Sequence, residues 1–316
     1  MPLDTQTSVM LKRLKAIDFS LTRDMTPEQA RYRQRALTRM AAPGEPVASV
    51  EDISIPGRIE GGTPLRIYTP KGDGLFPILI YFHGGGGVIG DLDSEDGLCR
   101  QLVNLAGCLV ISVAYHLAPE YKFPSGPYEC YAAVQWIATH AATFNGDASR
   151  LAIGGMSAGG NLAAVVTHMT RDRGGPHFVF QLLLTPLTDF RLLETPSLEH
   201  FAEGYFLTRE DILWFRQHCL NGEEDRKNPL ASPSLAASFS GLPPTLIITA
   251  EYDPLRDDGE CYGQLLKDAG TSVTILRIQG AIHGFVVPDQ MHAALSQSAS
   301  ALHFAFQSGI RQGISF

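Results

Sequence analysis

Ser157 stands in the middle of a Gly-x-Ser-x-Gly sequence that follows an apolar run at 151–154 and precedes a helix-like segment. This strand–turn–helix setting is typical of the nucleophile elbow. The turn strains the backbone of the serine, and the flanking Gly155 and Gly159 leave the room that it needs. Three fixed positions recur by chance in about one chain in ten of this size, so a glycine-rich turn without chemistry is the alternative.

A serine hydroxyl is a poor nucleophile at neutral pH and needs a general base within hydrogen-bond reach. His283 lies in the loop expected after the last strand, and a loop residue at the strand ends can reach the elbow. Other histidines fall on expected helices, at His140, His168, His292 and His303. His283 is therefore the predicted base.

The base needs a carboxylate that fixes its tautomer. Asp253 follows the expected strand 244–250 and gives the chain order Ser, Asp, His of one known triad arrangement. Asp189 is the rival, because it also follows an expected strand, but it heads a segment that interrupts the sheet pattern. Asp257 and Asp258 are expected to cap the next helix, where the macrodipole favours negative charge.

A histidine and four glycines, residues 83–87, come directly after the apolar run 77–82. Glycines let the main chain approach a substrate, and the bare N–H groups of such a loop suit an oxyanion. A glycine run can also cradle phosphate, but the Lys-Ser/Thr that the phosphate-binding pattern requires does not follow it. These segments therefore favour acyl transfer.

The segments that must position these residues alternate between strand and helix. Apolar or alternating runs predict strands at 47–55, 64–69, 77–82, 108–115, 150–154, 178–184, 244–250 and 272–278. Helical spacing predicts helices near 126–142, 158–171, 257–269 and 289–308. This rhythm predicts an α/β fold with a mostly parallel central sheet and helices on both faces.

Two segments break this rhythm. Residues 1–45 are expected to form one or two amphipathic helices, with a helix start at Thr26-Pro27-Glu28 and an apolar face at Val9, Leu11, Leu14 and Ile17. Residues 190–240 combine an aromatic-rich helix with a Pro/Ser-rich loop. We expect both segments to form a helical cap over a catalytic domain made of 46–189 and 241–316. The alternative is that these helices only cover core.

The composition is that of a globular protein, with 316 residues, 44% hydrophobic and 18% charged. A formal net charge of −8 favours neither nucleic acid nor an anionic membrane as a partner. The five cysteines have no metal-ligand spacing and are expected to be reduced and buried. No apolar run is long enough for a signal sequence or a membrane span, so a cytoplasmic location is expected.

Five ordered motifs together resemble the hormone-sensitive-lipase-like branch of the α/β hydrolases, the bacterial carboxylesterases. They are HGGG at 83–86, YHLAPE at 115–120, GMSAGGNLA at 155–163, EYDPLRDDGE at 251–260 and IHGF at 282–285. The resemblance implies an α/β-hydrolase fold with a helical cap and a triad of Ser157, His283 and Asp253. It also implies an oxyanion hole made by the N–H groups of Gly85, Gly86 and Ala158.

The same resemblance gives His83 a structural role in holding the oxyanion loop and makes Glu120 a supporting residue. The chain departs from the family pattern at several positions. Gly87 stands where an aromatic residue is usual, which predicts a more open pocket wall and a more mobile loop. Met156 replaces the common Asp or Thr beside the nucleophile. The other departures are His116 in place of Arg, and Pro127-Tyr128 in place of small helix formers.

The function expected from the motifs and the resemblance is that of a serine carboxylesterase acting on small esters of short acyl chains, without metal or cofactor. An amidase or lactone hydrolase would use the same triad. A non-catalytic small-molecule receptor on the same fold is the alternative of a different class, and the presence of His283 argues against it. The sequence leaves the oligomeric state open, although the family that it resembles frequently forms homodimers, and the strand at 272–278 is a candidate sheet edge for pairing.

Overall fold

The computed structural model describes residues 3–17, 19–22, 24–57, 59–191 and 194–312, and its centre is an eight-stranded sheet. The strand order is β1-β2-β4-β3-β5-β6-β7-β8. β2 pairs antiparallel with both of its neighbours, and all other pairs are parallel. The strands are β1 (Ser49–Ile55), β2 (Thr63–Thr69), β3 (Phe76–Phe82), β4 (Leu109–Val113), β5 (Gly146–Met156), β6 (Phe178–Leu184), β7 (Thr245–Tyr252) and β8 (Val273–Ile282).

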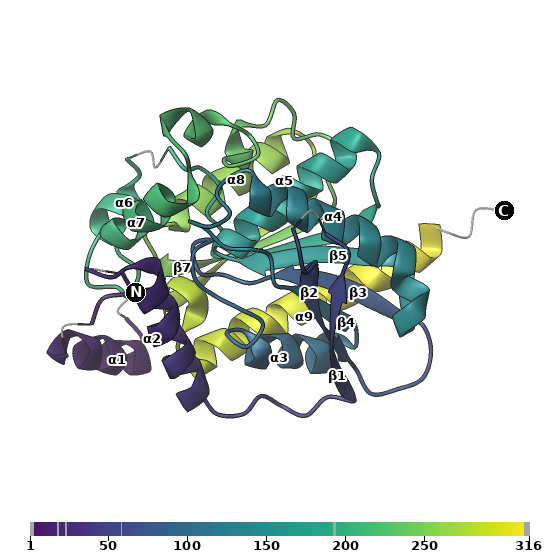
Figure 1. The fold of residues 1–316 in the computed structure, drawn as a ribbon, viewed down its shortest axis with the longest axis horizontal. Helices are drawn as coiled ribbons and strands as arrows, with labels where there is room; N and C mark the ends of the chain where they lie inside the picture. Colours follow the sequence, from purple (N-terminus) through teal and green to yellow (C-terminus); the bar gives the residue numbers. More distant parts are fainter. Residues whose placement is uncertain (1–2, 18, 23, 58, 192–193, 313–316) are drawn as a thin grey trace.

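Helices cover both faces of this sheet (Figure 1). One layer contains α4 (Ser125–His140), α5 (Ala158–Arg173) and α8 (Arg256–Asp268), and the other contains α3 (Asp96–Ala106) and α9 (Pro288–Gln312). The remaining helices are α1 (Thr5–Ala16), α2 (Pro27–Met40), α6 (Pro196–His200) and α7 (Arg209–Cys219), with short 3₁₀ turns at 141–144, 223–227, 233–235 and 283–285. The expected mostly parallel sheet between two helical layers is confirmed.

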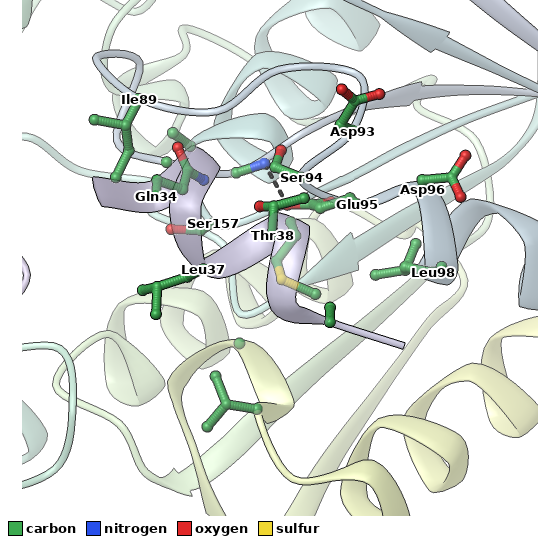
Figure 2. Close-up of a pocket in the computed structure, with 18 of the residues that line it drawn as sticks. Gln34, Leu37, Thr38, Ile89, Asp93, Ser94, Glu95, Asp96, Leu98 and Ser157 are labelled. Carbon is green, nitrogen blue, oxygen red and sulfur yellow. Dashed lines mark hydrogen bonds between the residues drawn. The ribbon is translucent and has the colours of Figure 1, made fainter. Parts of the chain in front are cut away.

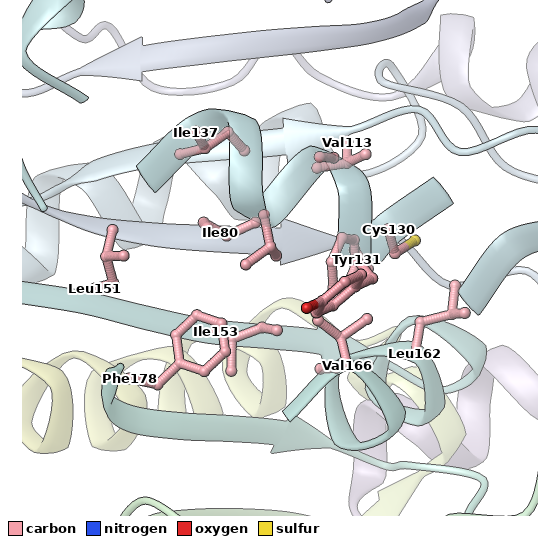
Figure 3. Packing of buried hydrophobic residues seen from close by; sticks show 14 of the residues in the cluster. Ile80, Val113, Cys130, Tyr131, Ile137, Leu151, Ile153, Leu162, Val166 and Phe178 are labelled. Carbon is pink, nitrogen blue, oxygen red and sulfur yellow. The ribbon is translucent and has the colours of Figure 1, made fainter. Parts of the chain in front are cut away.

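The central strands are buried on both sides, and β3 shows how the sequence achieves this. Ile78 and Ile80 pack toward α4 and α5, whereas Leu79 and Tyr81 pack toward α3 and α9. All four side chains have no exposed surface. A strand covered on both faces needs apolar residues at every position, which is why β3 reads as a continuous apolar run. Figure 3 shows the first of the two cores, with Ile80 beside Ile153 and Val166.

Four strands end directly before a residue that the sequence marks for chemistry. His83 follows β3, Ser157 follows β5, Asp253 follows β7 and His283 follows β8. The carboxyl ends of parallel strands lie along one edge of a sheet. The topology therefore brings four positions, separated by up to 200 places in the sequence, to the same edge of the molecule.

α2 and the helices of 190–240 pack against each other beside this edge (Figure 1). Ala30 of α2 shares a buried cluster with Ile212 and Phe215 of α7. The indole N–H of Trp214 donates to the carbonyl of Met25 at 3.2 Å. Two capping boxes define the helix starts, at Thr26 for α2, as expected, and at Thr208 for α7.

Two expectations about element bounds and burial were wrong. β8 continues to Ile282 rather than ending near 278, because Gly280 adopts a φ of 70° and the ladder resumes after a register shift, pairing Ile282 with Tyr252. The expected apolar face of α1 is only partly buried, since Leu11 and Leu14 are half-buried but Val9 is 44% exposed and Ile17 71%. α1 is instead held by polar contacts at its N-terminus, where Asp4 caps the helix.

Candidate active site

Ser157 occupies the sharp turn between β5 and α5. Its φ of 56° and ψ of −116° lie in a region that residues with side chains rarely adopt. The two flanking glycines make this turn possible, since a Cβ atom on Gly155 would lie 2.4 Å from backbone atoms of Gly159. The turn thus lifts the serine hydroxyl above the end of the sheet, as the sequence predicts for an elbow.

The structure brings Ser157, His283 and Asp253 into one hydrogen-bonded series. His283 Nε2 lies 3.0 Å from Ser157 Oγ, and His283 Nδ1 lies 2.8 Å from Asp253 Oδ2. A carboxylate only accepts, so Nδ1 carries the proton and Nε2 is left to accept the serine proton. The second carboxylate oxygen, Oδ1 of Asp253, accepts the N–H of Leu255 at 2.8 Å. Asp253 is wholly buried, so this imidazole is held in one tautomer and orientation.

The rival carboxylate, Asp189, has another partner. Its two oxygens accept hydrogen bonds from the guanidinium of Arg191 at distances between 2.6 and 3.0 Å. Asp257 and Asp258 lie in the first turn of α8, where the helix dipole favours negative charge, as expected, but the expectation that they cap the helix was wrong, because α8 has no side-chain cap. Asp257 accepts the N–H of Ser197, and Asp258 accepts the N–H and hydroxyl of Thr188. These carboxylates tie α8 to the segment between β6 and β7.

The three N–H groups expected to bind an oxyanion all border the same cleft. Within the described residues, the N–H groups of Gly85 and Gly86 have no intramolecular acceptor. Ala158 is the first residue of α5, where a backbone N–H has no helical acceptor and the helix dipole favours negative charge. These groups are therefore available to a ligand.

Each of these three N–H groups belongs to a peptide whose carbonyl, on the preceding residue, accepts a hydrogen bond on the side away from the cleft. The peptide that presents the Gly85 N–H has its oxygen, on Gly84, 2.7 Å from His83 Nδ1. The next oxygen, on Gly85, accepts the N–H groups of Val88 and Ile89 at 3.1 and 2.9 Å.

The third carbonyl belongs to Ser157, in the peptide that presents the Ala158 N–H. It accepts the N–H groups of Asn161 at 3.0 Å and Leu187 at 3.3 Å. All three donors are therefore held in place before any substrate arrives.

His83 supports this loop, in keeping with the role expected for it. Its ring stacks on Tyr115 with centroids 4.4 Å apart, and the Tyr115 hydroxyl donates to the His83 carbonyl at 2.8 Å. Burial lowers the pKa of His83, so the ring is neutral. Since Gly84 O can only accept, Nδ1 carries the ring proton.

A cleft of about 1260 Å³ opens over Ser157 and His283. Figure 2 shows α2 crossing this cleft, with Gln34, Leu37 and Thr38 over Ser157. A second and much smaller cavity, of about 70 Å³, adjoins it. The two cavities share Gly86, Ala158 and Phe190 in their linings, but His283 lines only the larger one.

Glu95 is a residue of the cleft that the sequence did not reveal. Glu95 is labelled in Figure 2, and its carboxylate accepts the N–H of Gly84 at 2.7 Å and the hydroxyl of Tyr81 at 2.5 Å. Burial raises the pKa of Glu95 to about 7, although both hydrogen bonds act in the opposite direction. Nothing in the sequence around a single glutamate at a helix start indicates this contact.

Arg31 and Gln34 of α2 were also missed. The Arg31 guanidinium bonds the carbonyls of Val88 and Ala118 at 2.8 and 2.7 Å and pairs with the Glu120 carboxylate. Gln34 accepts the N–H of Gly90 at 2.6 Å. Glu120, expected to support the site, thus anchors α2 to the segments that follow the glycine loop.

Two of the other departures from the family pattern, Met156 and His116, have a clear place in the structure. Met156 is buried and borders the cleft beside Ser157. His116 bonds the buried Glu129 through Nδ1 at 2.7 Å. Three of the five cysteines are buried, as expected, whereas Cys219 is partly buried and Cys261 is exposed.

The described part of the chain contains no group of three or more His, Cys, Asp or Glu side chains placed to hold a metal ion. In that same part of the chain, no helix has both the length and the apolar character needed to cross a bilayer.

Comparison with known proteins agrees with this fold. Residues 79–287 match the family described as alpha/beta hydrolase fold. The chain is 44% identical to the carboxylic ester hydrolase LipN of Mycobacterium tuberculosis over 81% of its length and 69% of that protein. It is 42% identical to the esterase LipI of the same organism, over 88% and 87% of the two chains. The hyperthermophilic esterase from the archaeon Pyrobaculum calidifontis superposes with a TM-score of 0.89 at 39% identity, over 96% of this chain and 99% of that one.

The fold and these matches define an α/β hydrolase. The chain belongs to the hormone-sensitive-lipase-like carboxylesterases of that superfamily, and it is a carboxylic ester hydrolase.

Proposed function

We propose that this protein hydrolyses esters through a covalent acyl-enzyme on Ser157. The observation that carries the proposal is the unbroken hydrogen-bonded series from Ser157 Oγ through the His283 ring to the buried Asp253 carboxylate. In this mechanism Nε2 of His283 takes the hydroxyl proton as Oγ attacks the ester carbonyl. Asp253 stays ionised and stabilises the imidazolium that forms.

The leaving alcohol takes its proton from His283 Nε2 as the tetrahedral intermediate collapses. A water molecule then occupies the place of the alcohol, gives its proton to the same nitrogen and attacks the acyl carbonyl. The second intermediate releases the carboxylic acid and returns the proton to Ser157. Ser157 and His283, which act directly on the substrate, line the larger cleft, and none of the steps requires a metal or cofactor.

The N–H groups of Gly85, Gly86 and Ala158 are the proposed oxyanion donors. Their support from behind argues for this role, because donors that do not reorganise stabilise developing charge most effectively. Removing one such donor costs about 3 to 4 kcal/mol of transition-state stabilisation in comparable enzymes.

The two cavities suggest which side takes the acyl chain. The leaving alcohol must lie near His283, which lines only the larger cleft. The acyl chain then points to the opposite side of the scissile bond, toward the cavity of about 70 Å³. We therefore propose acyl chains of about two to eight carbons, with the fastest turnover at the short end of that range.

Amide or lactone hydrolysis remains the alternative within the same machinery, since the triad does not by itself distinguish the leaving group. A receptor without catalysis is disfavoured, because the series of Ser157, His283 and Asp253 is complete. We further propose that 1–45 and 190–240 act as the cap, in view of their contacts with each other and with the cleft.

The decisive experiment is a panel of p-nitrophenyl esters from two to twelve carbons, matched anilides and simple lactones. The wild type and the variants Ser157→Ala and His283→Ala are assayed in parallel. We expect ester turnover to peak at short acyl chains and to be lost in both variants. Undiminished turnover in Ser157→Ala would refute the mechanism, and a rate maximum at long chains would refute the acyl-pocket assignment.

Homodimerisation is a separate proposal, and it rests on β8 lying at the edge of the sheet, where its outer backbone groups are available for pairing. Sedimentation of the wild type and of a variant with proline at Val273, whose N–H faces away from β7, tests it. We expect a dimer that dissociates in Val273→Pro, and a wild type that sediments as a monomer contradicts the proposal.

A further inference from the structure

The carbonyl of Gly86 has an unusual partner, the thiol of Cys219. Cys219 Sγ lies 2.9 Å from Gly86 O, although the two residues are 133 positions apart. The carbonyls on either side accept backbone N–H groups, from Val88 and Ile89 at Gly85 O and from Ala118 at Gly87 O. A side chain of α7 therefore completes the hydrogen bonding of the loop that presents the proposed oxyanion donors.

Gly87 makes this contact possible. A Cβ atom at this position would lie 3.0 Å from Cys219 Sγ, so a larger side chain would compete with the thiol for the same space. The sequence predicts an open pocket wall at Gly87, where an aromatic residue is usual. The Cys219 sulfur fills part of that space. Gly86 has no room on its other side either, because a Cβ atom there would lie 2.2 Å from the ring of Phe215.

The backbone of Cys219 is held in place by a hydrogen bond of its own. Its carbonyl accepts the N–H of Phe123 at 2.9 Å, which holds the end of α7 independently of the loop. Further along α7, the buried Asp211 accepts the hydroxyl of Thr22 at 2.6 Å. Phe215 and Cys219 therefore reach the glycine loop from a helix anchored at both ends.

The thiol is suited to a permanent donor role. Burial raises the pKa of Cys219 to about 12, with the positive charge of Lys122 opposing the shift only in part. The sulfur thus keeps its proton at neutral pH.

The glycines of the loop need such a contact. Gly86 adopts a φ of 62° and Gly87 a φ of 71°, and such flexible residues depend on outside contacts to hold one conformation.

We propose that Cys219 is a positioning residue for ester hydrolysis, whose thiol holds the peptide that follows Gly86. The peptide that precedes Gly86 is held by Val88 and Ile89, so the two sets of contacts together fix the backbone of Gly86 and direct its N–H toward the oxyanion. The inference rests on the function proposed for this site. It assigns to α7 a part in transition-state binding, beyond covering the cleft. Loss of the Cys219 thiol lowers kcat, because the Gly86 N–H is needed most when the carbonyl oxygen of the substrate becomes charged.

The test compares Cys219→Ala, which removes the donor, with Cys219→Ser, which replaces the thiol by a hydroxyl. We expect kcat on p-nitrophenyl acetate to fall about tenfold in the alanine variant, with KM unchanged, and to recover to within about threefold in the serine variant. Cys261→Ala, on the exposed side of α8, is the matched control and should retain full activity.

A second readout separates positioning from damage to the fold. A trifluoromethyl ketone forms a tetrahedral adduct with the serine, so its inhibition constant should rise in Cys219→Ala by the same factor as kcat falls. Unchanged kcat in Cys219→Ala overturns the inference, and so does a serine variant no better than alanine. If Ser157→Ala is as active as the wild type, the proposed function itself has failed, which is a distinct result.

Discussion

Gly159 lies so close to Phe82 that a Cβ atom built on the glycine would be 2.0 Å from the Phe82 carbonyl oxygen. Gly159 belongs to the first turn of α5, and Phe82 is the last residue of β3. The contact therefore joins the elbow that carries Ser157 to the strand that leads into the glycine loop. The nucleophile and two of its proposed oxyanion donors are held at a fixed separation by backbone packing.

Replacing Gly159 with alanine should disturb this separation. We expect kcat/KM on a short-chain ester to fall by about a hundredfold or more, because a displacement near 1 Å at the reacting atoms has that effect. Activity and the thermal midpoint are measured together. Gly222→Ala is the control, since a Cβ atom there meets nothing within 4 Å and its φ of −177° suits any residue. Equal activity of the two variants would contradict the prediction.

The assignment of the triad acid is tested by a matched pair of asparagine variants. Asp253→Asn should lower kcat by about 10⁴, because the amide favours the wrong tautomer of His283. Asp189→Asn should retain kcat within about threefold, since the Asp189 carboxylate bonds Arg191 and not His283. A larger loss in Asp189→Asn than in Asp253→Asn would reverse the assignment.

His83 should act through the hydrogen bond that it donates to Gly84 O. His83→Phe keeps the stacking on Tyr115 but has no donor, and we expect kcat to fall about tenfold. His83→Asn offers an amide N–H near the place of Nδ1 and should lose less. Steady-state kinetics on one ester decide between them, and identical losses would show that the ring shape, and not the donor, matters.

Glu95 should make stability depend on pH. Burial raises its pKa from 4.5 to about 7, so between these values the folded protein holds a proton that the unfolded chain has released. The free energy of unfolding contributed by this group therefore falls as pH rises from about 4.5 to 7. Glu95→Gln resembles the protonated form and should flatten this part of the profile.

The measurement is the thermal midpoint of each protein at pH 5 and pH 8. We expect Glu95→Gln to match the wild type at pH 5 and to exceed it at pH 8. The exposed Glu60→Gln should follow the wild type at both values. A Glu95→Gln profile parallel to that of the wild type would argue against a raised pKa.

Local patterns predict part of this site and not the rest. The positions of Ser157, Asp253 and His283 follow from strands that end just before them, because a parallel sheet brings such ends together. The contacts of Cys219 and Phe215 with Gly86 depend instead on how α7 docks. That docking is set by distant pairs such as Trp214 with Met25, which leave no local periodicity.

The errors have the same origin. Asp257 and Asp258 have the composition of a helix start, but Ser197 and Thr188 offer them donors from a segment some 60 to 70 residues away in sequence. α1 has apolar residues at helical spacing, yet capping and side-chain contacts with Asp289 and Gln290 decide its placement. In each case tertiary hydrogen bonds override a local preference.

Arg31 and Gln34 attach α2, which crosses the cleft, to residues 88–90. A movement of α2 is therefore transmitted to the segment that supports the glycine loop. Any bulky alcohol group that pushes α2 outward on its way in also pulls on the segment whose N–H groups brace Gly85. Oversized substrates will therefore be penalised in the speed of the chemical step as well as in how tightly they are held.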